Sequence, residues 1–283
     1  MPARGSPPFS PNGRLALKAA SGSAPRSASR TSGSARLAEL VRASSSVVAL
    51  TGAGISVPSG IPDFRTPGSG LWEKVDPMEV AHIDAFRRDP IRFWGFYSER
   101  FATLGEKQPN AAHRALAALQ GAGMLDAVIT QNVDMLHRKA GTQELVEVHG
   151  SIAGCSCLAC GTGVAAERAR ALMAADAEGV PRCEACGAPL KPDVVLFGEL
   201  LPEAALRRAE QLCVGAELLL CIGSSLEVYP VAALPELTLR SGGVVAIVTQ
   251  GATPLDELAS VRLHGDVVHE LQALLSALAL PPA

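Results

Sequence analysis

Four cysteines in two short motifs limit how this chain can fold. Two residues separate Cys157 from Cys160, two separate Cys183 from Cys186, and a glycine follows each pair. The short spacer lets both thiolates of a pair face one ion, and the glycine relieves crowding in the tight turn. Four sulfur ligands fill a tetrahedral site, so the motifs predict one structural Zn²⁺ ion with no open position for chemistry. The alternative is two redox or disulfide pairs.

The composition of the chain indicates a globular protein of a reducing compartment. Hydrophobic residues make up 48% of its 283 residues, which is enough for a sizeable core. The net charge of −3 and the 4% aromatic content argue against direct nucleic-acid binding. We expect Cys213 and Cys221 in the core and Cys155 as an unused thiol. Nothing in the sequence resembles a secreted disulfide framework, so the cytoplasm is the expected compartment.

Residues 1–36 differ in composition from the rest of the chain. They are rich in Ser, Pro, Gly and Ala and contain six Arg or Lys, and no acidic residue precedes Glu39. Such a stretch cannot bury enough apolar surface to fold, which predicts a disordered basic tail. The alternative is an organellar transit peptide, which would direct the protein to mitochondria. No apolar run in the sequence is long enough to cross a bilayer, so no membrane partner is expected.

Short apolar strands alternate with helical stretches over residues 37–280, which we expect to form one domain. This alternation is typical of an α/β fold with a doubly wound, Rossmann-like parallel sheet. Two inserts are expected, a loop and helical module at 62–110 and a small zinc ribbon at 151–193. The predicted strands are Ser46–Leu50, Ala127–Thr130, Leu145–Val148, Val194–Phe197, Leu218–Ile222 and Val244–Val248, and the predicted helices include Ala35–Ala43, Ala111–Ala122 and Glu203–Leu212.

Glycine and polar residues collect where these strands end, and doubly wound sheets bind ligands at the carboxyl ends of their strands. Gly52-Ala-Gly54 follows a strand and should open a helix whose backbone amides can meet a phosphate. As a dinucleotide fingerprint it is incomplete, because Val57 occupies the position of a third glycine. A glycine turn without a ligand is the alternative. Other segments at the predicted rim are Gln131–Asp134, His149-Gly150, Gly198-Glu199 and Gly223–Ser225.

Seven features occur in an order that resembles the sirtuin family of NAD-dependent protein lysine deacylases. They are Gly52–Ser56, Gly60–Arg65, Thr130–Asp134, His149-Gly150, the four cysteines, Phe197–Glu199 and Gly223–Leu226 with Val228–Pro230. The resemblance covers about residues 35–280. It implies a transferase that uses NAD as co-substrate and carries one structural zinc ion. Acyl-lysine proteins or peptides would be the substrates, and nicotinamide and O-acyl-ADP-ribose would be products.

The resemblance also assigns residues to the parts of NAD. Gly52, Ala53 and Gly54 would cradle the pyrophosphate, and Asn132 and Asp134 would belong to the nicotinamide pocket with Val133. The other implied contacts are Asp63, Phe64 and Arg65 on a cofactor loop, Gln131 at the nicotinamide-side ribose, Gly223, Ser224, Ser225 and Thr249 at the adenosine half, and Asp266 and Val267 beside adenine.

His149 is the implied general base, with Asn132 as a second catalytic residue. An imidazole titrates near neutrality, which suits removal of a proton from a ribose hydroxyl. The substrate backbone would be held as an added strand between two segments. The residues implied for these segments are Val195, Phe197 and Gly198 on one side and Glu227, Val228 and Tyr229 on the other.

Tyr97 and Arg100 stand three residues apart, so they share one face of a predicted helix. Within sirtuins this pair resembles one that binds the distal carboxylate of succinyl-lysine or malonyl-lysine, a task suited to the forked guanidinium. The alternative is a surface arginine beside a half-buried tyrosine. We expect acetyl-lysine to fit the same pocket.

The chain departs from the family pattern at two positions. Thr249 stands where sirtuins commonly have an Asn that meets the adenosine ribose, and Val133 replaces the more usual Ile. Neither change removes the chemistry. A mono-ADP-ribosyltransferase is the first alternative function, and a non-catalytic, zinc-stabilised NAD-binding module is the second.

Overall fold

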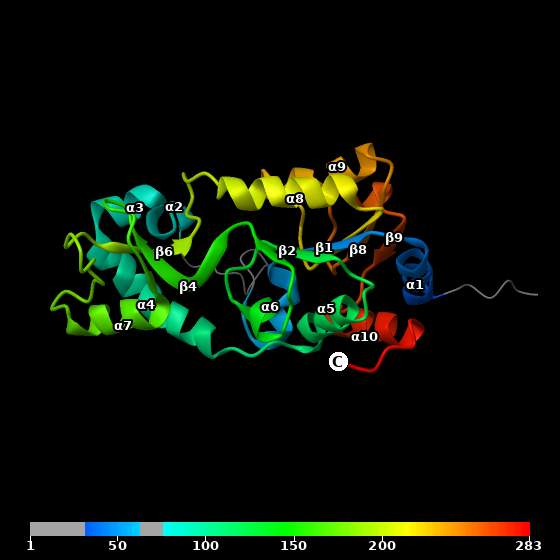
Figure 1. Cartoon of the computed structure of the whole chain (residues 1–283), viewed down its shortest axis with the longest axis horizontal. Coiled ribbons are helices and arrows are strands. Elements are labelled where there is room, and N and C mark those ends of the chain that lie inside the picture. The colour runs from blue at the N-terminus through cyan, green and yellow to red at the C-terminus, as the bar shows by residue number, and fades with distance from the viewer. Residues whose placement is uncertain (1–31, 63–75) are drawn as a thin grey trace, which may run out of the picture. The chain divides into compact units, whose positions relative to one another are not determined.

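Six parallel strands form the central sheet of the computed structural model, which describes residues 32–62 and 76–283 (Figure 1). They are β1 (Val47–Thr51), β2 (Ala127–Thr130), β3 (Leu145–Glu147), β7 (Leu218–Ile222), β8 (Val244–Val248) and β9 (Val261–Leu263). Their order is β3-β2-β1-β7-β8-β9. The chain therefore leaves β1 in one direction and continues from β7 in the other, which creates a switch point between β1 and β7 where such sheets bind ligands.

Helices cover both faces of this sheet, which explains why β1, β2 and β7 are buried along their whole length. On one face, α1 (Gly33–Ala43), α5 (Ala111–Gly121) and α10 (Val267–Ala277) contribute to one hydrophobic cluster with the sheet. On the other, α8 (Glu203–Gly215) and α9 (Leu234–Arg240) pack on a second cluster, which contains Cys213 and Cys221. The predicted doubly wound fold is confirmed.

A smaller unit joins the two predicted inserts around a third hydrophobic cluster. Its helices are α2 (Pro77–Val80), α3 (Ile83–Arg88), α4 (Pro90–Glu106) and α7 (Ala166–Ala175), and its antiparallel strands are β4 (Gly150–Cys157), β5 (Gly163–Ala165) and β6 (Leu190–Val194). The indole nitrogen of Trp94 on α4 donates to the Leu190 carbonyl at 3.0 Å, which ties the helical insert to the three-stranded sheet.

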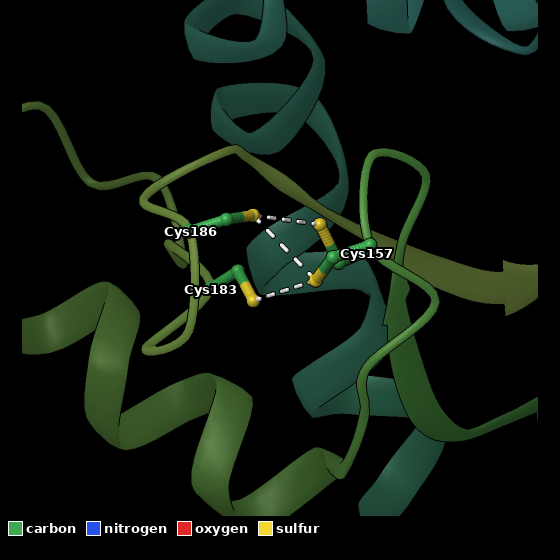
Figure 2. Close-up of side chains that lie close together, drawn as sticks. Cys157, Cys183 and Cys186 are labelled. Atoms are coloured by element: carbon green, nitrogen blue, oxygen red, sulfur yellow. Dashed lines mark hydrogen bonds between the residues drawn. The ribbon is translucent and has the colours of Figure 1, made fainter.

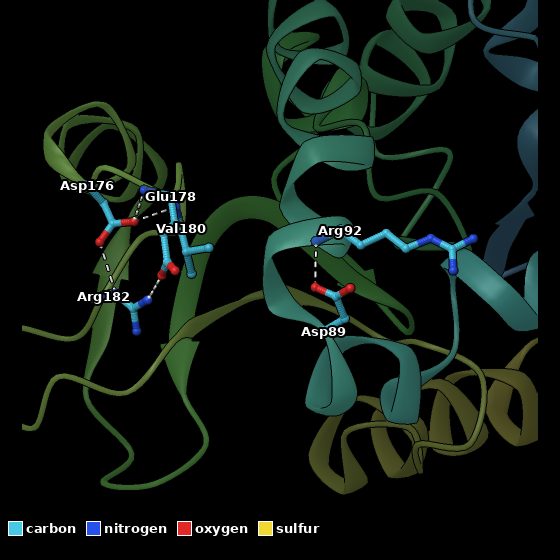
Figure 3. A network of polar contacts seen from close by, with 6 residues as sticks. All are labelled: Asp89, Arg92, Asp176, Glu178, Val180 and Arg182. Carbon is cyan, nitrogen blue, oxygen red and sulfur yellow. Dashed lines mark hydrogen bonds and ion pairs between the residues drawn. The ribbon is translucent and has the colours of Figure 1, made fainter.

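Two aspartates shape the ends of this unit's helices (Figure 3). Asp89 caps α4 by accepting from the Arg92 amide at 2.9 Å. Asp176 follows α7 and accepts from the Val180 amide at 3.1 Å and from the Arg182 guanidinium at 2.9 Å. Because Asp176 satisfies these donors in one turn, it directs the chain from α7 towards the second cysteine pair.

The structure corrects two predicted elements. The strand expected at Val194–Phe197 is not part of the parallel sheet. β6 ends at Val194, in the three-stranded sheet, and Phe197 lies outside the named strands, in an isolated bridge with His82. The run Val194–Phe197 resembled a core strand because it is apolar and partly buried. It lies where the central sheet and its helices meet the smaller unit. The helix expected after Gly52 is replaced by two single-turn 3₁₀ helices, Ala53–Ile55 and Val57–Ser59, and the second ends at Gly60 with a φ of 77°.

The helix predicted at Ala35–Ala43 begins earlier, at Gly33, because the Ser32 hydroxyl accepts from the Ala35 amide and caps it. It therefore begins within the stretch predicted as tail. Most of that stretch, residues 1–31, and the cofactor-loop residues Asp63, Phe64 and Arg65 lie outside the described residues. Within the described part of the chain, no helix is both long and apolar enough to cross a membrane.

Candidate functional site

Two glycine turns meet at the switch point between β1 and β7. The Gly54 amide donates to the Gly223 carbonyl at 2.8 Å, and a Cβ on Gly54 would lie 2.8 Å from that same oxygen. Gly223 has a φ of 61°, and a Cβ there would lie 2.3 Å from the Ile55 nitrogen. Only glycine allows this approach of two backbones. The result is a side-chain-free surface at the strand ends, which suits a phosphate group.

Three polar side chains form a cluster beside these turns, with Ser56 and Asp134 buried and Asn132 half-buried. The Ser56 hydroxyl donates to the Asp134 carboxylate at 2.6 Å and accepts from the Asn132 amide at 3.0 Å. Asn132 also donates to the Gly52 carbonyl at 3.1 Å. Burial raises the pKa of Asp134, and the hydrogen bonds from Ser56 and from the Leu136 amide oppose that rise. The cluster offers hydrogen-bond donors and acceptors in a desolvated place, as recognition of a carboxamide requires.

Two buried histidines lie behind this cluster. His113 on α5 lies 3.4 Å from the Ser56 hydroxyl, and His137 on α6 (Leu136–Lys139) lies 3.0 Å from the Thr51 hydroxyl. The rings stack edge to face with centroids 4.9 Å apart. Burial, assisted by Arg114, lowers the pKa of His113 to about 4, and burial next to His113 lowers that of His137 to about 3. Both rings are therefore neutral and packed inside the fold.

His149 follows β3 and has one imidazole nitrogen fixed by the backbone. Its Nδ1 lies 2.9 Å from the Gln131 carbonyl oxygen. A carbonyl only accepts, so Nδ1 carries the proton and Nε2 keeps a lone pair. Burial lowers the pKa of His149, and the hydrogen bond to Gln131 partly opposes this. The side chain is thus a neutral imidazole at physiological pH with Nε2 ready to accept a proton.

The segment predicted to bind substrate passes next to His149. The Val195 amide donates to the His149 carbonyl at 2.8 Å, and Phe197 exchanges backbone hydrogen bonds with residues 81 and 83 of the helical unit. Gly198 has a φ of 84°. In the opposite predicted segment, Glu227 and Tyr229 are exposed and Val228 is half-buried.

Tyr97 and Arg100 differ in environment, although they share a face of α4. Tyr97 is buried, and its burial raises the pKa of the phenol to about 12 while nearby Arg100 opposes that rise. Arg100 is exposed, stacks 3.6 Å above the Phe96 ring and donates to the Phe96 carbonyl at 2.5 Å. A guanidinium has five N–H donors, so this bond to the Phe96 carbonyl does not exhaust those of Arg100.

The residues predicted at the adenosine half follow β7, β8 and β9. Ser224 is buried and its hydroxyl accepts from the Gln131 amide at 2.9 Å, whereas Ser225 is exposed. The Thr249 amide donates to the Leu263 carbonyl at 3.1 Å. Asp266 caps α10 through the amides of Val268 and His269, and Val267 is buried in the helix that it starts. The adjacent strand ends bring these residues to the same rim.

The four predicted zinc ligands form one cluster (Figure 2). Their sulfur atoms all lie within 4.8 Å of one another, and Cys157 and Cys183 are buried whereas Cys160 and Cys186 are exposed. Gly161 and Gly187 each have a φ of 76°, as the sequence predicted for tight turns after the thiols. Four thiolates at this separation fit one tetrahedral zinc ion and leave no ligand position free. Cys155 is buried outside the cluster.

Sequence reasoning missed three contributors to the site. Ser56 belongs to the glycine motif, but its place in the Asp134 cluster was not predicted. His113 has no motif that links it to the site, yet it lies 3.4 Å from the Ser56 hydroxyl. Lys191 is buried beside the predicted substrate segment. The sequence did not predict this burial, because a lysine usually faces water.

Comparison with known proteins gives consistent matches. The model of the Sir2 family matches residues 52–230. An NAD-dependent protein deacetylase of Thermotoga maritima is 42% identical over 81% of this chain and 92% of its own length, and one of Sulfolobus acidocaldarius is 45% identical over 81% and 88%. A solved structure of Sir2 with a deacetylated peptide and 3′-O-acetyl ADP ribose has a TM-score of 0.81 at 39% identity and covers 87% of this chain and 98% of that one. Another, of Sir2 bound to acetylated peptide, has a TM-score of 0.80 at 38% identity, with the same coverage.

The fold and the site thus define a dinucleotide-binding α/β enzyme with a tetrahedral cysteine site in its smaller unit. The chain belongs to the Sir2 family.

Proposed function

We propose that this protein is an NAD-dependent protein lysine deacylase that removes acetyl groups, and also succinyl or malonyl groups, from lysine side chains. The observation that carries the proposal is His149, whose Nδ1 is held by the carbonyl of Gln131 at 2.9 Å, next in sequence to Asn132 of the polar cluster. Relatives more than 40% identical are named NAD-dependent protein deacetylases and deacylases, which supports the same activity here.

The described residues would contact NAD at its pyrophosphate, at its nicotinamide carboxamide, and at its ribose and adenosine parts. Gly52, Ala53 and Gly54 would receive the pyrophosphate at the switch point, where a Cβ on either glycine would collide with backbone. Asn132 and Asp134, with Val133 and Ser56, would hold the nicotinamide carboxamide. The other proposed contacts are Gln131, Gly223, Ser224, Ser225, Thr249, Asp266 and Val267, together with Asp63, Phe64 and Arg65 outside the described residues.

Bound NAD would supply a ribose carbon that the acyl oxygen of the lysine substrate can attack as nicotinamide departs, and a ribose hydroxyl that takes over the acyl group. Asn132 and Asp134, whose side chains are held by the Gly52 carbonyl and the Leu136 amide, would orient the departing amide. His149 accepts a proton at Nε2 from a ribose hydroxyl, and the Gln131 carbonyl stabilises the imidazolium that forms through Nδ1. The lowered pKa keeps His149 neutral before the reaction. Cys157, Cys160, Cys183 and Cys186 hold a structural zinc ion.

The acyl-lysine peptide would bind as an added strand. Val195, Phe197 and Gly198 would form one side of the slot and Glu227, Val228 and Tyr229 the other. Backbone pairing of this kind fixes the depth of the lysine while tolerating many sequences. This supports protein and peptide substrates as the partners. The compartment, cytoplasm or mitochondria, stays a prediction.

Arg100 would bind the distal carboxylate of an acidic acyl group, with the Tyr97 phenol beside it. Tyr97 remains a protonated donor because its pKa is raised to about 12. Both groups donate hydrogen bonds to a carboxylate and offer nothing comparable to a methyl group. The pair would therefore contribute to succinyl turnover and little to acetyl turnover.

A turnover assay with NAD and one peptide carrying either acetyl-lysine or succinyl-lysine tests this function. We expect the wild type to act on both. Arg100→Met should reduce kcat/KM for the succinyl peptide roughly 10- to 100-fold, the worth of a charged hydrogen bond, and should leave acetyl turnover within about twofold. Equal loss on both peptides would show that Arg100 is structural. ADP-ribose attached to protein, without deacylation, would instead support the transferase alternative.

A further inference from the structure

A buried lysine joins the zinc-bearing sheet to the loop beside His149. Lys191 lies on β6, and its side chain is 9% exposed. Its ammonium group donates to the carbonyl oxygens of Pro192 at 3.0 Å and Val194 at 2.7 Å, and it lies 3.0 Å from a Glu199 carboxylate oxygen. An ammonium group has three protons, so these acceptors occupy all of its donors.

The same carboxylate holds the centre of the loop. Glu199 Oε2 accepts from the Leu196 amide at 2.9 Å, and the Glu199 amide donates to the Leu196 carbonyl at 3.1 Å. Lys191 therefore binds both ends of residues 194–199, and Glu199 binds the middle. We call these two side chains, Lys191 and Glu199, the loop brace.

The braced loop lies between the predicted catalytic residue and the helical unit. On one side, the Val195 amide donates to the His149 carbonyl at 2.8 Å. On the other, the Phe197 amide donates to the Ala81 carbonyl and the Ile83 amide to the Phe197 carbonyl, both at 2.9 Å. A loop tied to both neighbours transmits any change in its own shape directly to the slot beside His149.

Burying an ion pair in this way is a poor source of stability, because desolvation of both charges offsets their attraction. The pair does, however, fix one geometry, since removal of either partner leaves a buried charge without compensation. Within the described part of the chain, the side-chain hydrogen bonds of the brace go to backbone atoms of residues 191–199, and its ion pair joins the two side chains to each other. Its effect is therefore concentrated on the conformation of that segment.

We infer that Lys191 and Glu199 are positioning residues for the acyl-lysine peptide: they hold the backbone of Val195–Gly198 in the shape that accepts an added strand. The inference rests on the proposed function, because it assigns a role within the same substrate slot. Neither side chain is placed against the reacting atoms. The brace acts on peptide binding through the loop, whereas the glycine turns and the Asn132 cluster that would hold NAD lie on other strand ends.

The test compares Glu199→Gln, Lys191→Met and Lys191→Arg with wild type, using NAD and an acetyl-lysine peptide. Glu203→Gln is the matched control, because Glu203 pairs with Arg207 on the exposed side of α8 and lies outside the loop. We expect Glu199→Gln and Lys191→Met to raise the KM for peptide about tenfold, the value of one charged hydrogen bond, and to leave the KM for NAD within about twofold. Lys191→Arg should recover most of the loss, because it keeps the charge and the donors.

Amide hydrogen exchange provides a second readout that a general loss of stability would not reproduce. Exchange at Leu196 should accelerate in Glu199→Gln, while exchange in β1 and β7 stays unchanged. An unchanged peptide KM in folded Glu199→Gln, or equal increases in the KM for peptide and for NAD, would overturn the inference. Wild-type protein that deacylates no peptide would overturn the proposed function, and this inference with it. The two failures can be told apart: if only the positioning role of the brace is wrong, the wild type still deacylates the peptide.

Discussion

At the scale of single residues, burial determines the protonation of the histidines. His113 is fully buried and His149 is partly buried, and burial lowers the pKa of each because it disfavours the charged imidazolium. The consequences differ with position. His149 has a proton-accepting nitrogen beside the substrate segment, whereas His113 packs against Ser56 and His137. The sequence alone could identify His149 through its motif, but it could not show that Gln131 fixes its tautomer.

His113 should make the protein acid-sensitive. Its pKa is about 4 in the fold and about 6.5 in an unfolded chain, so below pH 6.5 the unfolded chain binds more protons. Stability should therefore fall between pH 6.5 and 4, by roughly 1–2 kcal/mol at pH 5 from this residue. Thermal melts at pH 7 and pH 5 should show a smaller loss of Tm in His113→Asn than in wild type. The control is His269→Asn at an exposed position, which should lose as much Tm between pH 7 and pH 5 as the wild type does. If His113→Asn also loses as much Tm as the wild type, His113 is not the source of the acid sensitivity.

At the scale of elements, two turns position the site more than any helix does. Gly52–Gly54 and Gly223 bring the ends of β1 and β7 into backbone contact, and short 3₁₀ helices follow the first turn instead of the expected helix. The glycine spacing predicted a close backbone approach. It could not predict the 3₁₀ geometry, which depends on Pro58 and on the left-handed Gly60 that follows it.

Gly54→Ala should disturb this contact. The added Cβ would lie 2.8 Å from the Gly223 carbonyl oxygen, so the two turns must move apart. We expect a loss of roughly 1–3 kcal/mol in the free energy of unfolding, as in other overpacked sites, and weaker NAD binding by calorimetry. Gly95→Ala on α4 is the control: apart from its chain neighbours and the backbone of its own helix, no described atom lies within 4 Å of the added Cβ. Alanine also favours a helix over glycine by roughly 0.5–1 kcal/mol. NAD binding by Gly54→Ala at wild-type affinity would refute the proposed phosphate site.

At the scale of the whole molecule, the parallel sheet was predictable because its strands are apolar on both faces and its helices alternate with them. The predicted bounds of β2, β7 and β8 agree with the structure. The prediction of a parallel-sheet strand at Val194–Phe197 was wrong. Its residues are apolar because they are partly buried between the central sheet and the smaller unit, not because they belong to the parallel sheet. The zinc cluster was predictable from spacing alone. The loop brace was not predictable from the sequence, because it is the folded structure that brings the side chains of Lys191 and Glu199 together.

The most direct test of the account measures all products from NAD and an acetyl-lysine peptide, with wild type and with His149→Ala. We predict that wild type releases nicotinamide, free lysine and O-acetyl-ADP-ribose in equal amounts. His149→Ala should lower kcat at least about 100-fold, because a general base is lost, while its Tm stays near that of wild type. Unequal product amounts with ADP-ribose bound to protein, or undiminished turnover by His149→Ala, would contradict the account.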